Sequence, residues 1–194
     1  MKLHTLLLGA FLMLAISKTE NAQTKKVKAL PAKTAVNKSL PADKKPAPLF
    51  NLTSLDGKKF ELTALRGKIV VLNFWFTGCI PCVAEMPELN KLVEKFKNDD
   101  VVFIAPTLDA KSVLPAFLVK HPFEYSVVPS AGNLIVNTYR DGTGTVAFPV
   151  NIIIDQEGKI DTRLTNSLVK SNGNTKELEK FENAIKRLVQ KAAK

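Results

Sequence analysis

The sequence predicts an α/β domain in which helices flank a central mixed β-sheet and a β-hairpin precedes it. Residues 69–74 form a β-branched apolar run without charges, as expected of a central strand that is covered on both faces. Apolar residues at helical spacing follow over 83–96, and residues 101–105 form a second apolar run. Strand, helix and strand in this order indicate parallel strands joined by a right-handed crossover.

The other predicted elements have local signals at their ends. Turn residues such as Asp56-Gly57 separate apolar runs into hairpins, and polar residues ahead of helical patterns act as caps. These elements are a hairpin at 50–62, a helix at 113–118 capped by Ser112, a short strand at 125–128, a hairpin at 150–164 and a closing helix capped by Thr175. No internal repeat is present, so the chain predicts one domain.

The N-terminal residues have the organisation of a secretory signal. Lys2 is followed by the apolar run 6–16 and by a polar stretch that ends at Ala22. We therefore expect residues 1–22 to be a signal peptide and the protein to be periplasmic or otherwise extracytoplasmic. The alternative is a retained N-terminal anchor, although this run is short for a membrane span of about 20 residues.

The formal charge of +10 is concentrated in a linker-like segment. Residues 23–48 contain seven lysines and one aspartate, several prolines and no aromatic residue, so we expect a disordered linker. Residues 49–194, the predicted folded domain, carry only +3 of the charge. This distribution favours a solvated charge run over nucleic-acid binding.

The two cysteines, Cys79 and Cys82, are separated by only two residues. A bond between them constrains the unfolded chain very little, so it would be a poor structural disulfide. A zinc site needs about four nitrogen or sulfur ligands, and only His121 remains to add to the pair once the signal is removed. The spacing therefore predicts a redox pair.

The position of this pair predicts a different role for each cysteine. Cys79 lies between a buried strand and the first turn of a helix, where unpaired N–H groups and the helix dipole stabilise an anion. We expect its pKa to lie below that of a free thiol, which makes Cys79 the attacking thiolate. Cys82 is about one helical turn further along and is expected to be the resolving thiol.

The residues around the pair resemble the thioredoxin superfamily and, within it, the TlpA/ResA-like branch of exported reductants. Trp75 stands four residues before the first cysteine, Ile80-Pro81 separates the two, and Glu85-Met86-Pro87 follows. Asn73 stands where cytosolic thioredoxins have a buried aspartate, which matches the exported branch. The resemblance covers roughly residues 49–194 and implies a thioredoxin-like fold.

The resemblance also implies roles for Phe148, Pro149 and Glu85. The expected roles of Trp75 and His121 follow from their positions in the chain. Phe148-Pro149 matches the cis-proline opposite the disulfide, where the residue before the proline offers its backbone to an extended substrate. A glutamate at the position of Glu85 influences thiol protonation in this branch and could take the proton of Cys82; the alternative is a solvent-facing side chain. Trp75 is expected to be a packing platform, with substrate contact as a second role. His121 is expected to cap a helix.

The predicted function is therefore thiol-disulfide exchange, with reduction of disulfides in exported proteins as the leading direction. Apocytochrome c is one candidate substrate that the resemblance implies. The chain has no dinucleotide fingerprint, so we expect no cofactor and a membrane-embedded electron donor. The alternatives are an oxidant of the same fold, a metal-carrying binding module, and a peroxiredoxin-like peroxidase. The peroxidase pattern T-x-x-C is not met, because Phe76 occupies the threonine position.

Overall fold

The computed structural model describes residues 45–139 and 146–192. All of them fall in one unit of the chain, Val36–Lys194. The expected signal peptide, residues 1–22, and the expected linker up to residue 44 lie outside the described residues. Within the described ranges, no helix is both long and apolar enough to cross a membrane.

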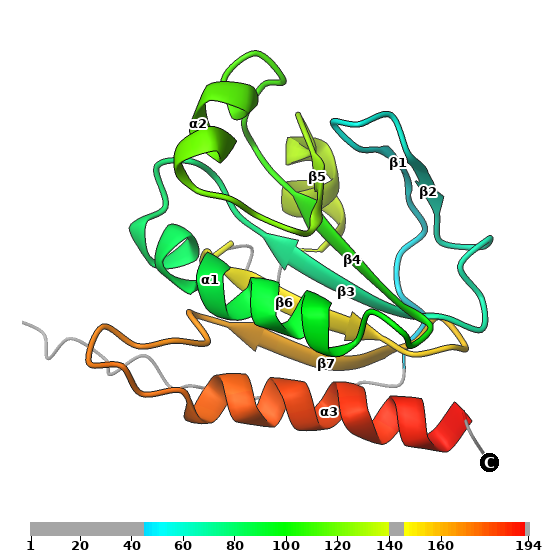
Figure 1. The fold of residues 1–194 in the computed structure, drawn as a ribbon. Helices are drawn as coiled ribbons and strands as arrows, with labels where there is room; N and C mark the ends of the chain where they lie inside the picture. Colours follow the sequence, from blue (N-terminus) through cyan, green and yellow to red (C-terminus); the bar gives the residue numbers. More distant parts are fainter. Residues whose placement is uncertain (1–44, 140–145, 193–194) are drawn as a thin grey trace, which may run out of the picture. The chain divides into compact units, whose positions relative to one another are not determined.

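The central sheet has five strands and mixed direction, as the sequence predicts. Its strands are β3 (Ile69–Phe74), β4 (Val101–Pro106), β5 (Ser126–Val128), β6 (Val150–Ile154) and β7 (Ile160–Thr165). They lie in the order β5-β4-β3-β6-β7 (Figure 1). β4 is parallel to β3 and β5, whereas β6 is antiparallel to β3 and β7. The strand that leads into the redox pair, β3, is therefore the middle of the sheet.

Both faces of the sheet are covered, which explains why every residue of β3 is buried. Ile69 and Val71 belong to one core cluster, with apolar side chains of α1 (Ile80–Lys95), α2 (Leu114–Lys120) and α3 (Lys176–Ala192). Val70, Leu72 and Phe74 belong to the other cluster. That cluster includes side chains from the hairpin of β1 (Asn51–Thr53) and β2 (Lys59–Glu61) and from a π-helical segment, η1 (Leu134–Thr138). Alternate side chains of β3 thus point to opposite faces of the sheet and belong to two separate core clusters.

The ends of α2 differ in part from the sequence prediction. The N-cap is Val113 and no side chain caps this end, so the expected cap at Ser112 is wrong. Pro115 lies in the first turn and has no N–H, which leaves fewer donors for a cap to satisfy. At the other end His121 is the C-cap, as expected, and its N–H donates to the carbonyl of Phe117 at 3.0 Å.

The folded unit starts before residue 49, where the sequence predicted the end of a linker. Pro46 forms a β-bridge with Lys159, and the N–H of Ala47 donates to the carbonyl of Gly158 at 2.9 Å. Ala47 is buried, and the hydroxyl of Tyr139 donates to the carbonyl of Pro48 at 2.8 Å. These residues find backbone partners on the β6–β7 turn, which composition alone does not reveal.

Candidate functional site

The two cysteines form a disulfide at the N-terminus of α1. Their Cα atoms are 5.3 Å apart. Cys79 is the N-cap residue, and its Sγ accepts a hydrogen bond from the N–H of Cys82 at 3.3 Å. Cys79 is 5% exposed and Cys82 is 1% exposed. The sulfur of Cys79 therefore lies where helix N–H groups can stabilise a thiolate, and Cys79 is the less buried residue of the two.

A partly buried carboxylate holds the loop that leads from β3 to Cys79. One Oδ of Asp109 accepts from the backbone N–H of Thr77 at 2.7 Å, and the other accepts from the Thr77 hydroxyl at 3.0 Å. The hydroxyl of Thr107 also donates to Asp109, at 2.8 Å. The segment after β4 thus fixes the backbone two residues before Cys79.

This arrangement also locates the two residues that bear on the peroxidase alternative. The ring of Phe76 stands edge-on to the ring of Phe148, with centroids 5.2 Å apart. The hydroxyl of Thr77 donates to Asp109. The position three residues before Cys79 is thus occupied by the ring of Phe76, which packs on Phe148. The hydroxyl of the next residue, Thr77, is already bound to Asp109.

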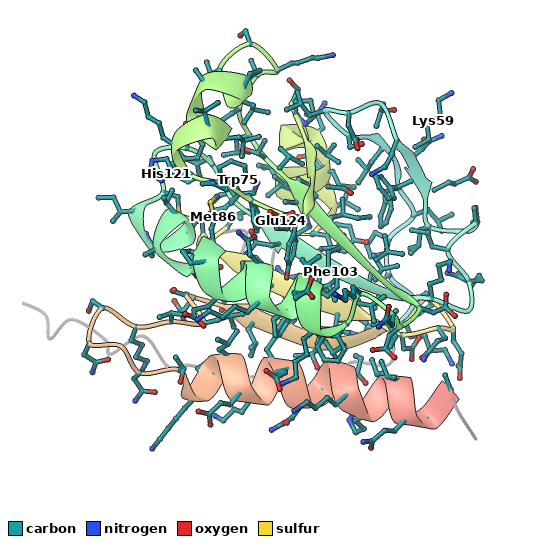
Figure 2. All side chains as sticks on the ribbon, in the orientation of Figure 1. Lys59, Trp75, Met86, Phe103, His121 and Glu124 are labelled. Carbon is teal, nitrogen blue, oxygen red and sulfur yellow. A yellow bond between two sulfur atoms is a disulfide. The ribbon has the colours of Figure 1, made fainter. Side chains whose placement is uncertain are left out.

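Trp75 is the first residue of the loop that leads from β3 to Cys79, and it is fully buried. In Figure 2 its labelled side chain lies inside the molecule, between α1 and α2. Its ring packs against Phe117 and Phe123, at centroid distances of 5.6 and 5.9 Å, and Nε1 donates to the carbonyl of Ala105 at 3.4 Å. The structure therefore places Trp75 as a packing platform and corrects the expected second role, because a side chain without exposed surface does not touch a docked substrate.

Glu85 is the one carboxylate buried in the core of the described residues. The solvent-facing alternative is wrong, because its relative exposure is 0%. Oε1 accepts from Nδ2 of Asn73 at 3.0 Å and from Nδ2 of Asn151 at 3.3 Å. Oε2 accepts from the N–H of Leu168 at 2.8 Å and from the hydroxyl of Ser167 at 3.1 Å. Four uncharged donors therefore surround a group that lies one turn beyond Cys82 on α1.

Burial and hydrogen bonding act in opposite directions on this carboxyl. Burial raises the pKa of Glu85 to about 7, and the hydrogen bonds from Leu168, Asn151, Ser167 and Asn73 limit that rise. Removal from water disfavours the charged form, whereas donors aimed at the oxygens favour it. Glu85 can therefore take up or release a proton near neutral pH, which is the range that suits a general acid or base.

The expected cis-proline is present. The Phe148–Pro149 peptide bond is cis, and Pro149 is buried while Phe148 is partly exposed. The carbonyl of Pro149 accepts from the N–H of Asn166 at 3.0 Å. β6 begins at the next residue, Val150, and lies antiparallel to β3. Pro149 is therefore bound to the turn after β7, while Phe148 contacts Phe76 in the loop between β3 and Cys79.

Several site residues were not predicted from the sequence. Asn151 is a polar residue inside the buried strand β6, directly opposite Asn73, and that position was a usable signal. Ser167 lies in a turn and Asp109 follows a strand, and neither position stands out along the chain. In the described ranges no three histidine, cysteine, aspartate or glutamate side chains form a group able to hold a metal ion.

Comparison with solved structures gives the class of the fold. The chain superimposes on the thioredoxin domain of a thiol-disulfide oxidoreductase from Bacteroides vulgatus with a TM-score of 0.57 and 26% identity. That match covers 75% of this chain and 100% of the other. A thiol:disulfide interchange protein of the thioredoxin family from Chlorobium tepidum gives a TM-score of 0.61 at 24% identity, over 77% and 99% of the two chains. The fold is thioredoxin-like, and it carries a paired-cysteine site.

Comparison of sequences gives the family. The model of the AhpC/TSA family matches residues 44–163, and the chain belongs to that family. The thiol-disulfide oxidoreductase ResA of Bacillus thuringiensis subsp. konkukian is 38% identical over 117 residues, which are 60% of this chain and 65% of that protein. ResA of Bacillus cereus strain ZK is 37% identical over 127 residues, 65% and 71% of the two chains. The chain thus matches about two thirds of the length of these relatives.

The ionisation of Glu85 predicts a pH dependence of stability. Its carboxyl ionises near 4.5 in the unfolded chain and near 7 in the folded protein. The folded state therefore binds the proton more tightly, so this contribution is complete below the unfolded pKa and is lost as pH rises through about 7. Between about pH 4 and 8 the free energy of unfolding of the oxidised wild type should fall by roughly 3 kcal/mol relative to that of Glu85→Gln.

Urea unfolding at both pH values measures this difference. Glu94→Gln is the matched control, because this glutamate is on the same helix and its side chain is 72% exposed. It should follow the wild type at both pH values. Parallel pH profiles for the wild type and Glu85→Gln would show that Glu85 keeps its ordinary pKa in the folded protein.

Proposed function

We propose that the protein is an extracytoplasmic thiol-disulfide oxidoreductase that reduces disulfides of exported proteins. The observation that carries the proposal is the Cys79–Cys82 disulfide at the N-terminus of α1, with the buried Glu85 one turn further along the same helix. The names of the ResA relatives support it, since both are called thiol-disulfide oxidoreductases. The signal-like N-terminal sequence supports export.

The first step is attack by Cys79 on a substrate disulfide. With the pair reduced, the thiolate of Cys79 forms a bond to one substrate sulfur, and the other substrate sulfur leaves as a thiolate. The N-cap position favours the thiolate form, because the N–H of Cys82 in the first turn points at Sγ. The product of this step is a mixed disulfide between Cys79 and the substrate.

The second step is resolution by Cys82. Glu85 in its ionised form accepts the proton of the Cys82 thiol, and the resulting thiolate attacks Sγ of Cys79. The Cys79–Cys82 bond forms as the bond to the substrate breaks, and the substrate leaves as its second thiolate. The position of Glu85 one turn from Cys82 and its pKa of about 7 support this assignment. A membrane-embedded dithiol donor must then return two electrons to the disulfide.

Phe148 and Pro149 are proposed to bind the substrate segment that carries the disulfide. Phe148 is partly exposed and its ring contacts Phe76, so this segment lies beside the loop that leads from β3 to Cys79. An extended peptide can pair with the backbone of Phe148, which requires no particular side chain from the substrate. Exported proteins with accessible disulfides, apocytochrome c among them, are the proposed partners.

The direction of transfer depends on the reduction potential of the pair. A potential near about −270 mV is typical of a reductant, and one near about −120 mV of a strong oxidant. We propose the reducing direction. A measured potential near about −120 mV would instead mean that the protein oxidises substrate thiols.

The purified protein should catalyse the reduction of insulin by dithiothreitol, because exchange needs only a low-pKa thiol beside a resolving partner. Turbidity of the released insulin chains measures the rate. Cys79→Ser should fall to the uncatalysed rate. Insulin reduction at the wild-type rate by Cys79→Ser would remove Cys79 as the nucleophile.

Cys82→Ser should accumulate long-lived mixed disulfides with substrates, since attack still occurs while resolution does not. Cys79→Ser is the matched comparison and should accumulate none. Non-reducing gels of the two variants recovered from cells, followed by mass spectrometry of the trapped bands, measure this and identify the partners. Trapping by Cys79→Ser alone would mean that the two roles are reversed.

Glu85→Gln should lengthen the lifetime of the mixed disulfide and lower the pKa of a neighbouring thiol. The variant loses a proton acceptor, which slows resolution, and a negative charge, which otherwise opposes thiolate formation. Decay of a preformed mixed disulfide measures the first effect, and thiolate absorbance against pH the second. Glu94→Gln serves again as the control, and unchanged values in Glu85→Gln would exclude Glu85 from the mechanism.

A further inference from the structure

The turn that follows β7 contacts Glu85 and the proline segment at once. We propose that Ser167 is a positioning residue that keeps the Glu85 carboxylate able to accept the Cys82 proton, through the backbone turn that its hydroxyl closes. This inference rests on the proposed role of Glu85 in resolution. It adds a residue from outside the helix that carries the cysteines and assigns the turn a part in the reaction.

Ser167 acts on Glu85 in two ways. Its hydroxyl oxygen lies 3.1 Å from Oε2 of Glu85. The same oxygen lies 2.6 Å from the carbonyl oxygen of Val169 and 3.3 Å from its nitrogen, so it closes a tight turn around Leu168. That turn directs the N–H of Leu168 at Oε2, at 2.8 Å. The single hydroxyl hydrogen is shared between Oε2 and the Val169 carbonyl, and the contact to Val169 is the shorter one. Loss of the hydroxyl therefore weakens one hydrogen bond to Oε2 and loosens the turn that directs the other.

The carboxylate depends on these donors because it is buried. A carboxyl without water stays protonated unless hydrogen bonds stabilise its charge, and a protonated Glu85 cannot take a proton from Cys82. The donors on Oε1 come from Asn73 and Asn151, which the pairing of β3 with β6 holds opposite each other. Both donors on Oε2 come from the turn after β7. The turn therefore supplies half of the anion's hydrogen bonds.

The same turn is hydrogen-bonded to Phe148-Pro149, the segment proposed to bind the substrate. The N–H of Asn166 donates to the carbonyl of Pro149 at 3.0 Å. Asn166 has φ of 126°, a backbone conformation that side-chain-bearing residues rarely adopt and that persists where the surrounding structure imposes it. Consecutive residues thus bind the proline segment on one side and the proton acceptor on the other.

The other groups that act on Glu85 must be held constant in any test. They are the amides of Asn73 and Asn151, the two cysteines on its own helix and the phenol of Tyr125. Burial, and then the charge of Glu85, raise the pKa of Tyr125 well above its usual range, so this phenol stays neutral at working pH. The cysteines do not titrate while the disulfide is closed. In the oxidised protein the titration of Glu85 can therefore be observed without theirs.

The test compares Ser167→Val with Ser167→Thr in the full chain. The two side chains have nearly the same shape, and only threonine retains a hydroxyl. The carboxyl carbon resonance of Glu85, assigned by its loss in Glu85→Gln, reports the titration in the oxidised protein. Ser167→Val should raise the pKa of Glu85 by about one unit, since a hydrogen bond to a charged group is lost. Ser167→Thr should titrate like the wild type.

The exposed Ser171 of the same loop provides the matched control, and Ser171→Ala should leave the titration unchanged. The pH profile of mixed-disulfide decay in Ser167→Val should move upward by the same amount, which a purely structural role would not produce. Equal titrations for the wild type and Ser167→Val, or equal shifts in the valine and threonine variants, would overturn the proposal. Because the titration is read in the oxidised protein, it stands apart from insulin reduction, whose failure would instead overturn the proposed function.

Discussion

The site depends on one constraint, which is that a carboxylate placed in the core must be surrounded by donors. Glu85 is on the sheet-facing side of α1 and has no exposed surface. An unpaired charge there would be strongly destabilising, and the structure meets the requirement with donors from β3, β6 and the turn after β7. These hydrogen bonds connect α1, which carries both cysteines, to the middle of the sheet. The orientation of α1 about its axis therefore depends on the hydrogen bonds of Glu85 as well as on apolar packing.

A second carboxylate restrains the site from outside the core. Asp109 accepts two hydrogen bonds from Thr77 and one from Thr107, and so joins the redox loop to the end of β4. The buried ring of Trp75, at the start of the same loop, packs against Phe117 and Phe123. Cys79 is therefore held between a helix that is anchored at Glu85 and a loop that is anchored at Asp109, which limits the movement of its sulfur relative to Phe148.

The environments of the two cysteines differ, although the residues are identical and three positions apart. Cys79 is at the helix terminus, where N–H groups favour a thiolate. Cys82 is more enclosed and lies one turn from a carboxylate whose pKa is about 7. One environment places helix N–H groups beside a sulfur, and the other places an ionisable carboxyl one turn away on the same helix. Opposed environments of this kind are how proteins assign different roles to like groups.

Local pattern in the sequence was sufficient for the strands, for helices α1 to α3 and for the redox pair, whereas the π-helical segment η1 was not predicted. The strands 69–74 and 101–105, the hairpins and the spacing of Cys79 and Cys82 each depend on neighbours along the chain. The tertiary structure decided the burial and hydrogen bonding of Glu85, because its four partners lie 12, 66, 82 and 83 positions away and become neighbours only through the strand order. It also decided the burial of Trp75, the clamp at Asp109 and the inclusion of residues 45–48. Each of these depends on which distant segment supplies a contact, and a polar residue in a turn, such as Ser167, carries no local sign of its partner.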